Sequence, residues 1–395
     1  MALTVKQNTT IAIEEEVTEG TYVAPAGASS FLQTLADGTE ITPSKELLER
    51  NIFNGSLGKT SPRTGTRTVS GAIPVEARAN STAGSAPEYD KLMKSAFGSR
   101  RQATTTTTTK ASGNTATVLQ IEDADISKFA VGDIVLVKQS GAYHVSPITA
   151  KSTGTGTATI TLLVAHPSGD MTDSVVIEKF TTYKLANSGH PSLSISKYVD
   201  DAVLEKAIGA RVTSVALEGF ATGQIPSLNF GFEGLDFDRE VAAPGYTPSY
   251  DSALPPIVLD ARLYMDGVAV DVNEVTVSIE NTLGFATAIS AENGRTSGRA
   301  TSRSVTGTFN PYKQDDSIAN FTKFKDNTAF SLFAYAKVPT STAGQFGQIV
   351  AFYLPNCLIT ELGEADQDGL LQETVSFTAS RGASGTTDEI FFTTI

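Results

Sequence analysis

The sequence of 395 residues contains no tryptophan, one cysteine and three histidines, and it has 30 Lys and Arg residues against 43 Asp and Glu. A single cysteine cannot form an internal disulfide, which agrees with a reducing compartment. The net charge of −13 disfavours ordinary nucleic-acid recognition, because phosphate binding needs clustered Lys and Arg. The chain shows neither an apolar run of membrane-spanning length nor a signal peptide, so we expect a soluble protein that is not secreted.

The residues that usually carry catalysis form no recognisable set. His144, His166 and His190 lack a partner at metal-ligand spacing. Cys357 stands in the apolar segment 353–359, which predicts a small buried hydrophobic residue. The acidic run 361–369 lacks the fifth- and twelfth-position acids of a calcium loop. No Walker A loop, dinucleotide fingerprint or nucleophile elbow occurs. We therefore expect no enzyme activity, no cofactor and no metal site.

The chain is punctuated by glycine, proline, threonine and serine, which leaves little room for long helices. Apolar and polar residues alternate in 192–196 and in 371–379, a pattern typical of half-buried strands. Other segments rich in β-branched or aromatic residues predict strands at 67–77, 133–138, 211–218, 228–233, 303–310, 330–337 and 349–354. The predicted fold class is mainly β with few helices.

Two helices are predicted. The first covers 87–97 and ends at Gly98, and its apolar residues on one face are Tyr89, Leu92, Met93 and Phe97. The second covers 317–326, and its apolar residues at three-residue spacing are Ile318, Phe321 and Phe324.

Parts of the sequence repeat. Residues 67–73 (RTVSGAI) and 303–309 (RSVTGTF) share a pattern at an offset of 236, and a predicted helix follows each. Residues 209–223 parallel 355–369 at an offset of 146. The offsets differ by 236 − 146 = 90, so the first copy must hold about 90 residues that the second lacks.

Composition indicates where these extra residues lie. A threonine run at 104–109 and a Thr- and Gly-rich segment at 151–159 bracket a predicted strand near 133–138. We therefore expect an inserted external β-domain at 103–182, a first unit formed by 1–102 and 183–245, and a second unit at 246–395. Within the first unit, residues 1–40 are expected to form an arm, because Gly20, Pro25 and Gly27 interrupt regular structure.

Short motifs outside the insert resemble the major tail tube proteins of long-tailed, siphovirus-type bacteriophages with non-contractile tails. In the first unit they are 16–25 (EVTEGTYVAP), 46–50 (ELLER), 55–58 (GSLG) and 71–76 (GAIPVE). In the second they are 304–309 (SVTGTF), 354–356 (LPN), 365–369 (ADQDG) and 377–379 (FTA).

The resemblance implies a β-sandwich or barrel whose copies form rings that stack into a hollow tube for DNA ejection. The duplication favours trimeric rings with pseudo-sixfold symmetry, with a hexamer as the alternative. The implied partners are further copies of the chain, tape-measure, tail terminator and distal tail proteins, and DNA that passes without specific binding. No membrane is implied. The implied location is the virion tail, and the host cytoplasm during assembly.

Two groups of residues are candidates for this role. Acidic walls would repel phosphates over a Debye length of about 8 Å. The pool of lumen candidates comprises Glu218, Glu233, Asp236, Asp238, Glu361, Glu364, Asp366 and Asp368. The polar, basic segments 52–66 and 286–301 are expected to be loops that mediate ring stacking, through Arg63, Arg67, Arg295, Arg299 and Arg303. The alternative is a virion component that does not polymerise, such as a decoration or adhesin-like β-protein; a polysaccharide hydrolase ranks lowest.

Overall fold

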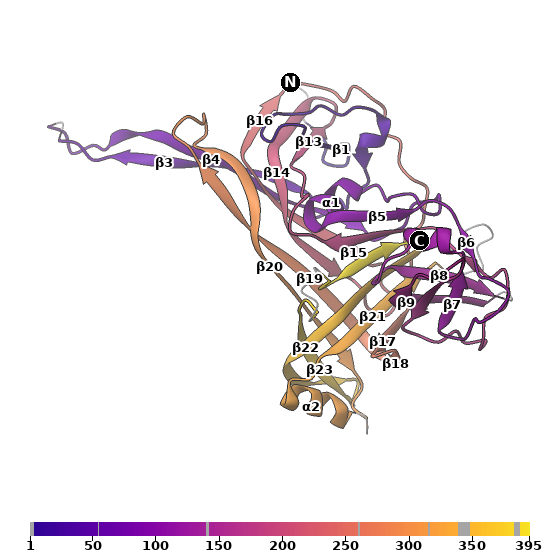
Figure 1. The fold of residues 1–395 in the computed structure, drawn as a ribbon. Helices are drawn as coiled ribbons and strands as arrows, with labels where there is room; N and C mark the ends of the chain where they lie inside the picture. The colour runs from indigo at the N-terminus through magenta and orange to yellow at the C-terminus, as the bar shows by residue number, and fades with distance from the viewer. Residues whose placement is uncertain are drawn as a thin grey trace.

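The computed structural model describes residues 4–53, 55–139, 142–259, 261–314, 317–338, 348–382 and 388–395. These residues form two sheets, and the larger one curls into a nearly closed barrel (Figure 1). Its strands are β1 (Thr9–Glu15), β2 (Phe31–Leu32), β3 (Glu40–Arg50), β4 (Thr60–Glu76), β5 (Gly98–Ala103), β12 (Phe180–Leu185), β13 (Leu193–Val199), β14 (Val203–Glu218), β15 (Ser227–Gly234), β16 (Asp236–Glu240), β17 (Arg262–Met265), β18 (Val268–Val270), β19 (Val272–Thr287), β20 (Arg295–Pro311), β21 (Phe330–Lys337), β22 (Ile349–Gln367), β23 (Leu370–Ala379) and β24 (Phe391–Thr394).

Eight of these strands form two blocks with the same pairing order. The first block runs β3–β4–β15–β14 and the second runs β19–β20–β23–β22, with antiparallel neighbours throughout. The two blocks join where β14 pairs with β19, so that one sheet runs through both. A single continuous sheet therefore contains the same four-stranded arrangement twice.

The two blocks also agree at individual residues. An added Cβ at Gly71 would lie 2.1 Å from the Glu40 carbonyl oxygen and 2.6 Å from Phe232. The corresponding distances from Gly307 to Thr276 and Phe377 are 2.3 and 2.6 Å. Only glycine allows so close an approach of a neighbouring strand and ring. The repeated glycine of the sequence pattern thus has the same packing function in both blocks.

A bulge fixes the alignment of the blocks. The ladder skips residue 213 in β14 and residue 360 in β22. Aligning these bulges gives an offset of 147 residues in β14 and β22, and aligning Phe232 with Phe377 gives 145 in β15 and β23. The offset of 146 expected for residues 209–223 is therefore one residue too small in β14 and β22, and one residue is enough to change the face on which a side chain lies.

The sheet through both blocks has one apolar and one polar face. Along β15, buried Leu228, Phe230 and Phe232 alternate with half-exposed Asn229 and Gly231. The central strands β14 and β19 alternate in the same way. We call the side with serine, threonine and acidic residues the polar face. The apolar face is covered by helix α1 (Asp90–Phe97) and by the remaining strands of the barrel.

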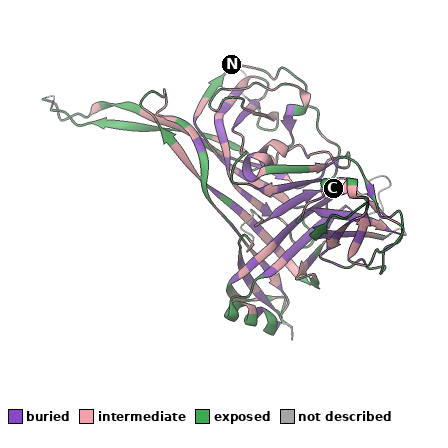
Figure 2. Cartoon of the chain, in the orientation of Figure 1, coloured by how far each residue is buried: buried purple, intermediate pink, exposed green. Residues whose placement is uncertain are grey.

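The second helix, α2 (Ser317–Asp326), has the bounds that its apolar spacing predicts. Its packing differs from what the apolar spacing predicts, because the buried residues are the polar Ser317 and Asn320. Ile318, Phe321 and Phe324 are 72%, 57% and 40% exposed. Figure 2 shows this helix in the colour of exposed residues at one end of the molecule.

The second sheet lies beside the second block (Figure 1) and is built from residues 107–177. Its strands are β6 (Thr107–Thr108), β7 (Val118–Ile121), β8 (Ile134–Gln139), β9 (Ala142–Ser152), β10 (Ala158–Leu162) and β11 (Val176–Ile177). The short 3-10 helix η2 (Asp123–Lys128) also lies in this segment, whereas a second one, η1 (Ala28–Ser30), precedes β2 of the larger sheet. The core of this small sheet includes Phe333, Tyr353 and Phe391 from β21, β22 and β24. It is therefore packed onto strands of the larger sheet and not merely tethered to the chain.

The N-terminal arm expected over residues 1–40 is not free in the described part of the chain. Residues 9–15 form β1, which pairs with β13 and β2. Ile11, Ala12 and Ile13 are buried by this pairing. The glycines and proline that suggested an arm lie in the connection after β1, where Glu16 and Glu19 bind Gly209 and Arg211 at 2.7 and 2.8 Å.

The loops expected at 52–66 and 286–301 are also corrected. The connecting segments are 51–59 and 288–294. The other residues of the two expected loops belong to the paired strands of the hairpins β3–β4 and β19–β20. Threonine-rich strands with no core of their own can pair as long ribbons because their backbone groups satisfy one another. The β3–β4 hairpin projects far from the body (Figure 1).

Candidate assembly surfaces

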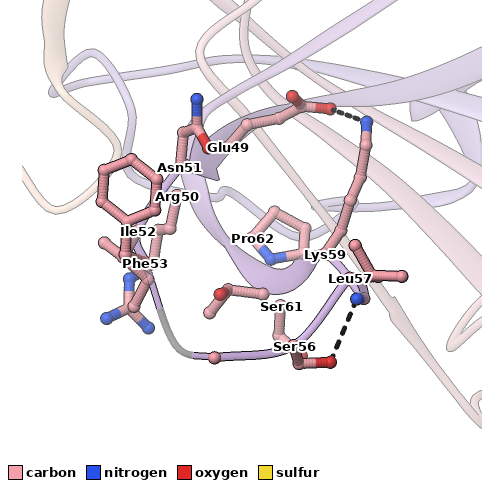
Figure 3. Close-up of a pocket in the computed structure, with 13 residues that line it drawn as sticks. Glu49, Arg50, Asn51, Ile52, Phe53, Ser56, Leu57, Lys59, Ser61 and Pro62 are labelled. Carbon is pink, nitrogen blue, oxygen red and sulfur yellow. Dashed lines mark hydrogen bonds and ion pairs between the residues drawn. The ribbon is translucent and has the colours of Figure 1, made fainter.

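The tip of the β3–β4 hairpin is open to solvent and unusually apolar. Figure 3 shows the residues around its connecting loop, where the Glu49 carboxylate and the Lys59 ammonium group lie 3.5 Å apart. Ile52 is 51% exposed, and Phe53 and Leu57 are fully exposed. Apolar side chains on an exposed tip are typical of a contact with another molecule. These residues were not among the predicted site residues, although apolar pairs at 47–48 and 52–53 break the polar pattern of the segment.

The five candidate stacking arginines fall into two groups. Arg67, Arg295 and Arg303 bind acids of the same chain: Asp236, Glu233 and Glu389, each with a closest distance of 2.9 Å. Arg63 and Arg299 are exposed and have no ion-pair partner within the described part of the chain. Since Arg63 lies opposite Leu48 and Arg299 opposite Gly284, these two free arginines belong to the two hairpins.

The candidate lumen acids are dispersed over the structure. Glu218 and Glu361 are exposed and lie on the polar face, and Glu233 lies there next to Arg295. The other five lie elsewhere or have partners in the chain. Asp236 and Asp238 are on β16 next to Arg67 and Lys206, Glu364 is paired with Lys313, and Asp366 and Asp368 end β22 and its turn.

Strand register places further acids on the polar face that the sequence analysis did not select. Glu280 is exposed and lies opposite Ser214 on β14. Glu40 of β3, opposite Ala72, and Glu76 of β4, opposite Ser227, also lie on this face. The alternation of apolar and polar residues shows on which face of its own strand each of these acids lies. Only the pairing of the strands shows that the acids share one surface.

The described residues contain no cluster of three His, Cys, Asp or Glu side chains that could hold a metal ion. The rings of His144 and His166 lie 5.3 Å apart, although 22 positions separate them in the sequence, and burial lowers the pKa of both. His144 Nε2 lies 2.8 Å from the Val164 carbonyl oxygen, so this ring has a structural partner. Cys357 is buried as predicted, and burial raises the pKa of its thiol.

Long exposed hairpins, two equivalent blocks and a Ser- and Thr-rich sheet surface are typical of a structural protein. Comparison with family models matches residues 6–379 to the family described as phage tail tube protein, so the chain belongs to that family and has a structural role in the virion tail. The match includes residues 103–182. A comparison with curated proteins finds no match. None of the helices in the described ranges is long and apolar enough to cross a membrane.

Proposed function

We propose that this chain assembles into stacked rings that form a hollow tail tube, through which genomic DNA passes into the host. The observation that carries the proposal is the continuous sheet of two equivalent blocks, whose polar face is acidic and rich in serine and threonine. Repetition of one block around a ring would turn this face into a closed wall. An acidic wall repels phosphate and lets DNA slide without binding.

The duplication supports three chains per ring, because two blocks times three chains supply six equivalent blocks. Six chains per ring would supply twelve blocks and a wider tube. The trimer is the simpler arrangement, because the resemblance implies that relatives with one block per chain form rings of six chains. Tape-measure, terminator and distal tail proteins would then fix the length and the ends of the tube.

The hairpins support contacts between rings. The β3–β4 hairpin extends beyond the sheet, and its exposed apolar tip and Arg63 are available for a neighbouring ring. Arg299 has a comparable position on the second hairpin. If Arg63 and Arg299 meet the acidic body of another ring, charge complementarity would set the stacking register.

The test is polymerisation of the purified chain, followed by negative-stain electron microscopy. Hollow stacked rings are expected for the wild type. The Arg63→Glu and Arg299→Glu double variant should give folded chains that form shorter or no tubes. The Arg262→Glu and Arg381→Glu double variant has the same charge change away from the hairpins and serves as the control. Compact particles that never polymerise, even with other tail proteins, would favour a decoration or adhesin-like component.

A further inference from the structure

The sheet through the two blocks ends in two unpaired edges. At one end, β3 pairs with β4 and with no other strand in the described part of the chain. At the other, the second half of β22 pairs with β23, and no other described strand pairs with residues 358–367. Pro43 lies in β3, and proline within sheets is confined to edge strands. Exposed edges present unpaired backbone groups that can pair with another chain, and Pro43, which has no N–H, can contribute only its carbonyl group to such pairing.

The chain itself shows how such edges fit. The half of β14 that corresponds to the free half of β22 pairs with β19, which corresponds to β3. The observed pairs are Ser214–Glu280, Val215–Ile279, Ala216–Ser278 and Leu217–Val277. The junction between the first and second block is therefore a template for the junction between the second block and the first block of another copy.

We propose that β22 of one copy pairs antiparallel with β3 of the next, in the register of the β14–β19 junction. This inference rests on the proposed assembly into rings and names its interface. Transferring the register by the offsets of 147 and 236 residues gives the pairs Glu361–Ser44, Leu362–Pro43, Gly363–Thr42 and Glu364–Ile41. Such a contact is heterologous, so it closes into a ring when the rotation between copies permits.

The helices provide an independent observation. Helix α1 covers the β14–β19 junction: Met93 and Phe97 line a small apolar space together with Val277 and Ile279 of β19, and the Asn281 side chain donates to the Ala96 carbonyl at 3.0 Å. Helix α2 contacts β22, and its Asn320 donates to Glu373 of β23 at 3.2 Å. It therefore occupies the same place beside the free edge that α1 occupies beside the internal junction.

Burial at equivalent positions shows that β3 and α2 each lack the packing partner that β19 and α1 have in the internal junction. Val277, Ile279 and Asn281 of β19 are buried, whereas their equivalents Ile41, Pro43 and Lys45 of β3 are half-exposed or exposed. The apolar residues of α2 that have no cover are Ile318, Phe321 and Phe324. A second copy placed by the template lays β3 under α2 and covers both sets of residues at once. The occupant of the exposed helix face is thus β3 of the neighbouring copy.

Disulfide trapping in the full chain tests the register. Thr42→Cys with Gly363→Cys places two thiols opposite each other across the proposed junction, and Gly363 has room for a Cβ, since its nearest neighbour lies at 3.6 Å. Oxidation should give covalently linked chains on non-reducing gels. Ala216→Cys with Ser278→Cys is the equivalent pair inside one chain and should crosslink without linking chains. Thr42→Cys with Gln367→Cys lies roughly 13 Å out of register and should not crosslink.

A second measurement tests the helix. Phe321→Asp should raise the protein concentration needed for assembly about tenfold or more, because it places a charge in the covered face. Val241→Asp, at another exposed apolar residue, should leave that concentration unchanged. If the wild type forms tubes but Gly363→Cys links no better than Gln367→Cys, or if Phe321→Asp assembles normally, this interface is wrong and the tube function stands. A wild type that never associates overturns both.

Discussion

Helices α1 and α2 follow corresponding strands of the two blocks, yet one is buried and the other is exposed. In α1, Leu92 and Met93 are 0% exposed and pack into the barrel core. In α2, Ile318 and Phe321 face solvent, and the buried positions are polar. The difference teaches that apolar residues at helical spacing predict an apolar helix face, but do not predict whether the same chain covers that face. Stability measurements on the single chain and on the assembly should therefore separate the two helices.

The largest expected effect on folding is in α1. Leu92→Ala should lower the free energy of unfolding by about 2–5 kcal/mol, because it leaves a cavity in a fully buried site. Phe321→Ala in α2 should change it by less than about 0.5 kcal/mol. Denaturant titration of the unassembled chain measures both. Equal losses of stability in the two variants would show that α2 is part of the monomer core.

The two repeated glycines test whether the blocks are equivalent in energy as well as in geometry. Gly71→Ala and Gly307→Ala should each destabilise the chain by about 1–3 kcal/mol, because the new methyl group would meet a backbone carbonyl and a phenylalanine ring. Gly245→Ala, which has open space around the added Cβ, is the matched control. A loss at only one of the two positions would contradict the equivalence. Thermal unfolding of the three variants provides the comparison.

The remaining expected effect depends on pH and concerns the small sheet, whose core includes Ala103 of β5 and Phe180 of β12 as well as residues of β21, β22 and β24. Asp133 is buried next to Gly132, whose Cα faces Phe391 of β24, and burial raises the pKa of the Asp133 carboxyl to about 7 although Arg101 opposes the shift. The folded chain then holds a proton between about pH 4 and pH 7 that the unfolded chain has lost. Stability should fall as pH rises through this window, by at most about 1.4 kcal/mol per pH unit.

Asp133→Asn should flatten this decline, because the amide stays uncharged and can still accept the hydrogen bond from the Ala130 amide. Asp173→Asn, at an exposed aspartate, should keep the slope of the wild type. Unfolding titrations at several pH values between 4 and 7 distinguish the variants. A slope that survives Asp133→Asn would assign the proton to another group.

Local patterns of sequence predicted the β-rich class, the bounds of α2 and the strands around the repeated glycines. They could not predict that strands continue for many residues beyond their apolar segments, as in the β3–β4 hairpin, because the pairing of a ribbon depends on a partner strand and not on composition. They also could not place Glu280 beside Ser214, since this needs the register between two blocks. The candidate acids were selected near repeated strands, and the bulges at residues 213 and 360 change which of their neighbours share a face.

The two hairpins show a further consequence of having both blocks in one polypeptide. The β19–β20 turn is fastened to the first block, where the Asn293 side chain donates to the Leu235 carbonyl at 2.6 Å, whereas the β3–β4 turn carries the fully exposed Phe53 and Leu57. Identical single-block subunits would have to evolve every such turn together, since one gene would encode all of them. With both blocks in one chain, each turn can change independently, and here one turn contacts the body of the subunit while the other extends into solvent.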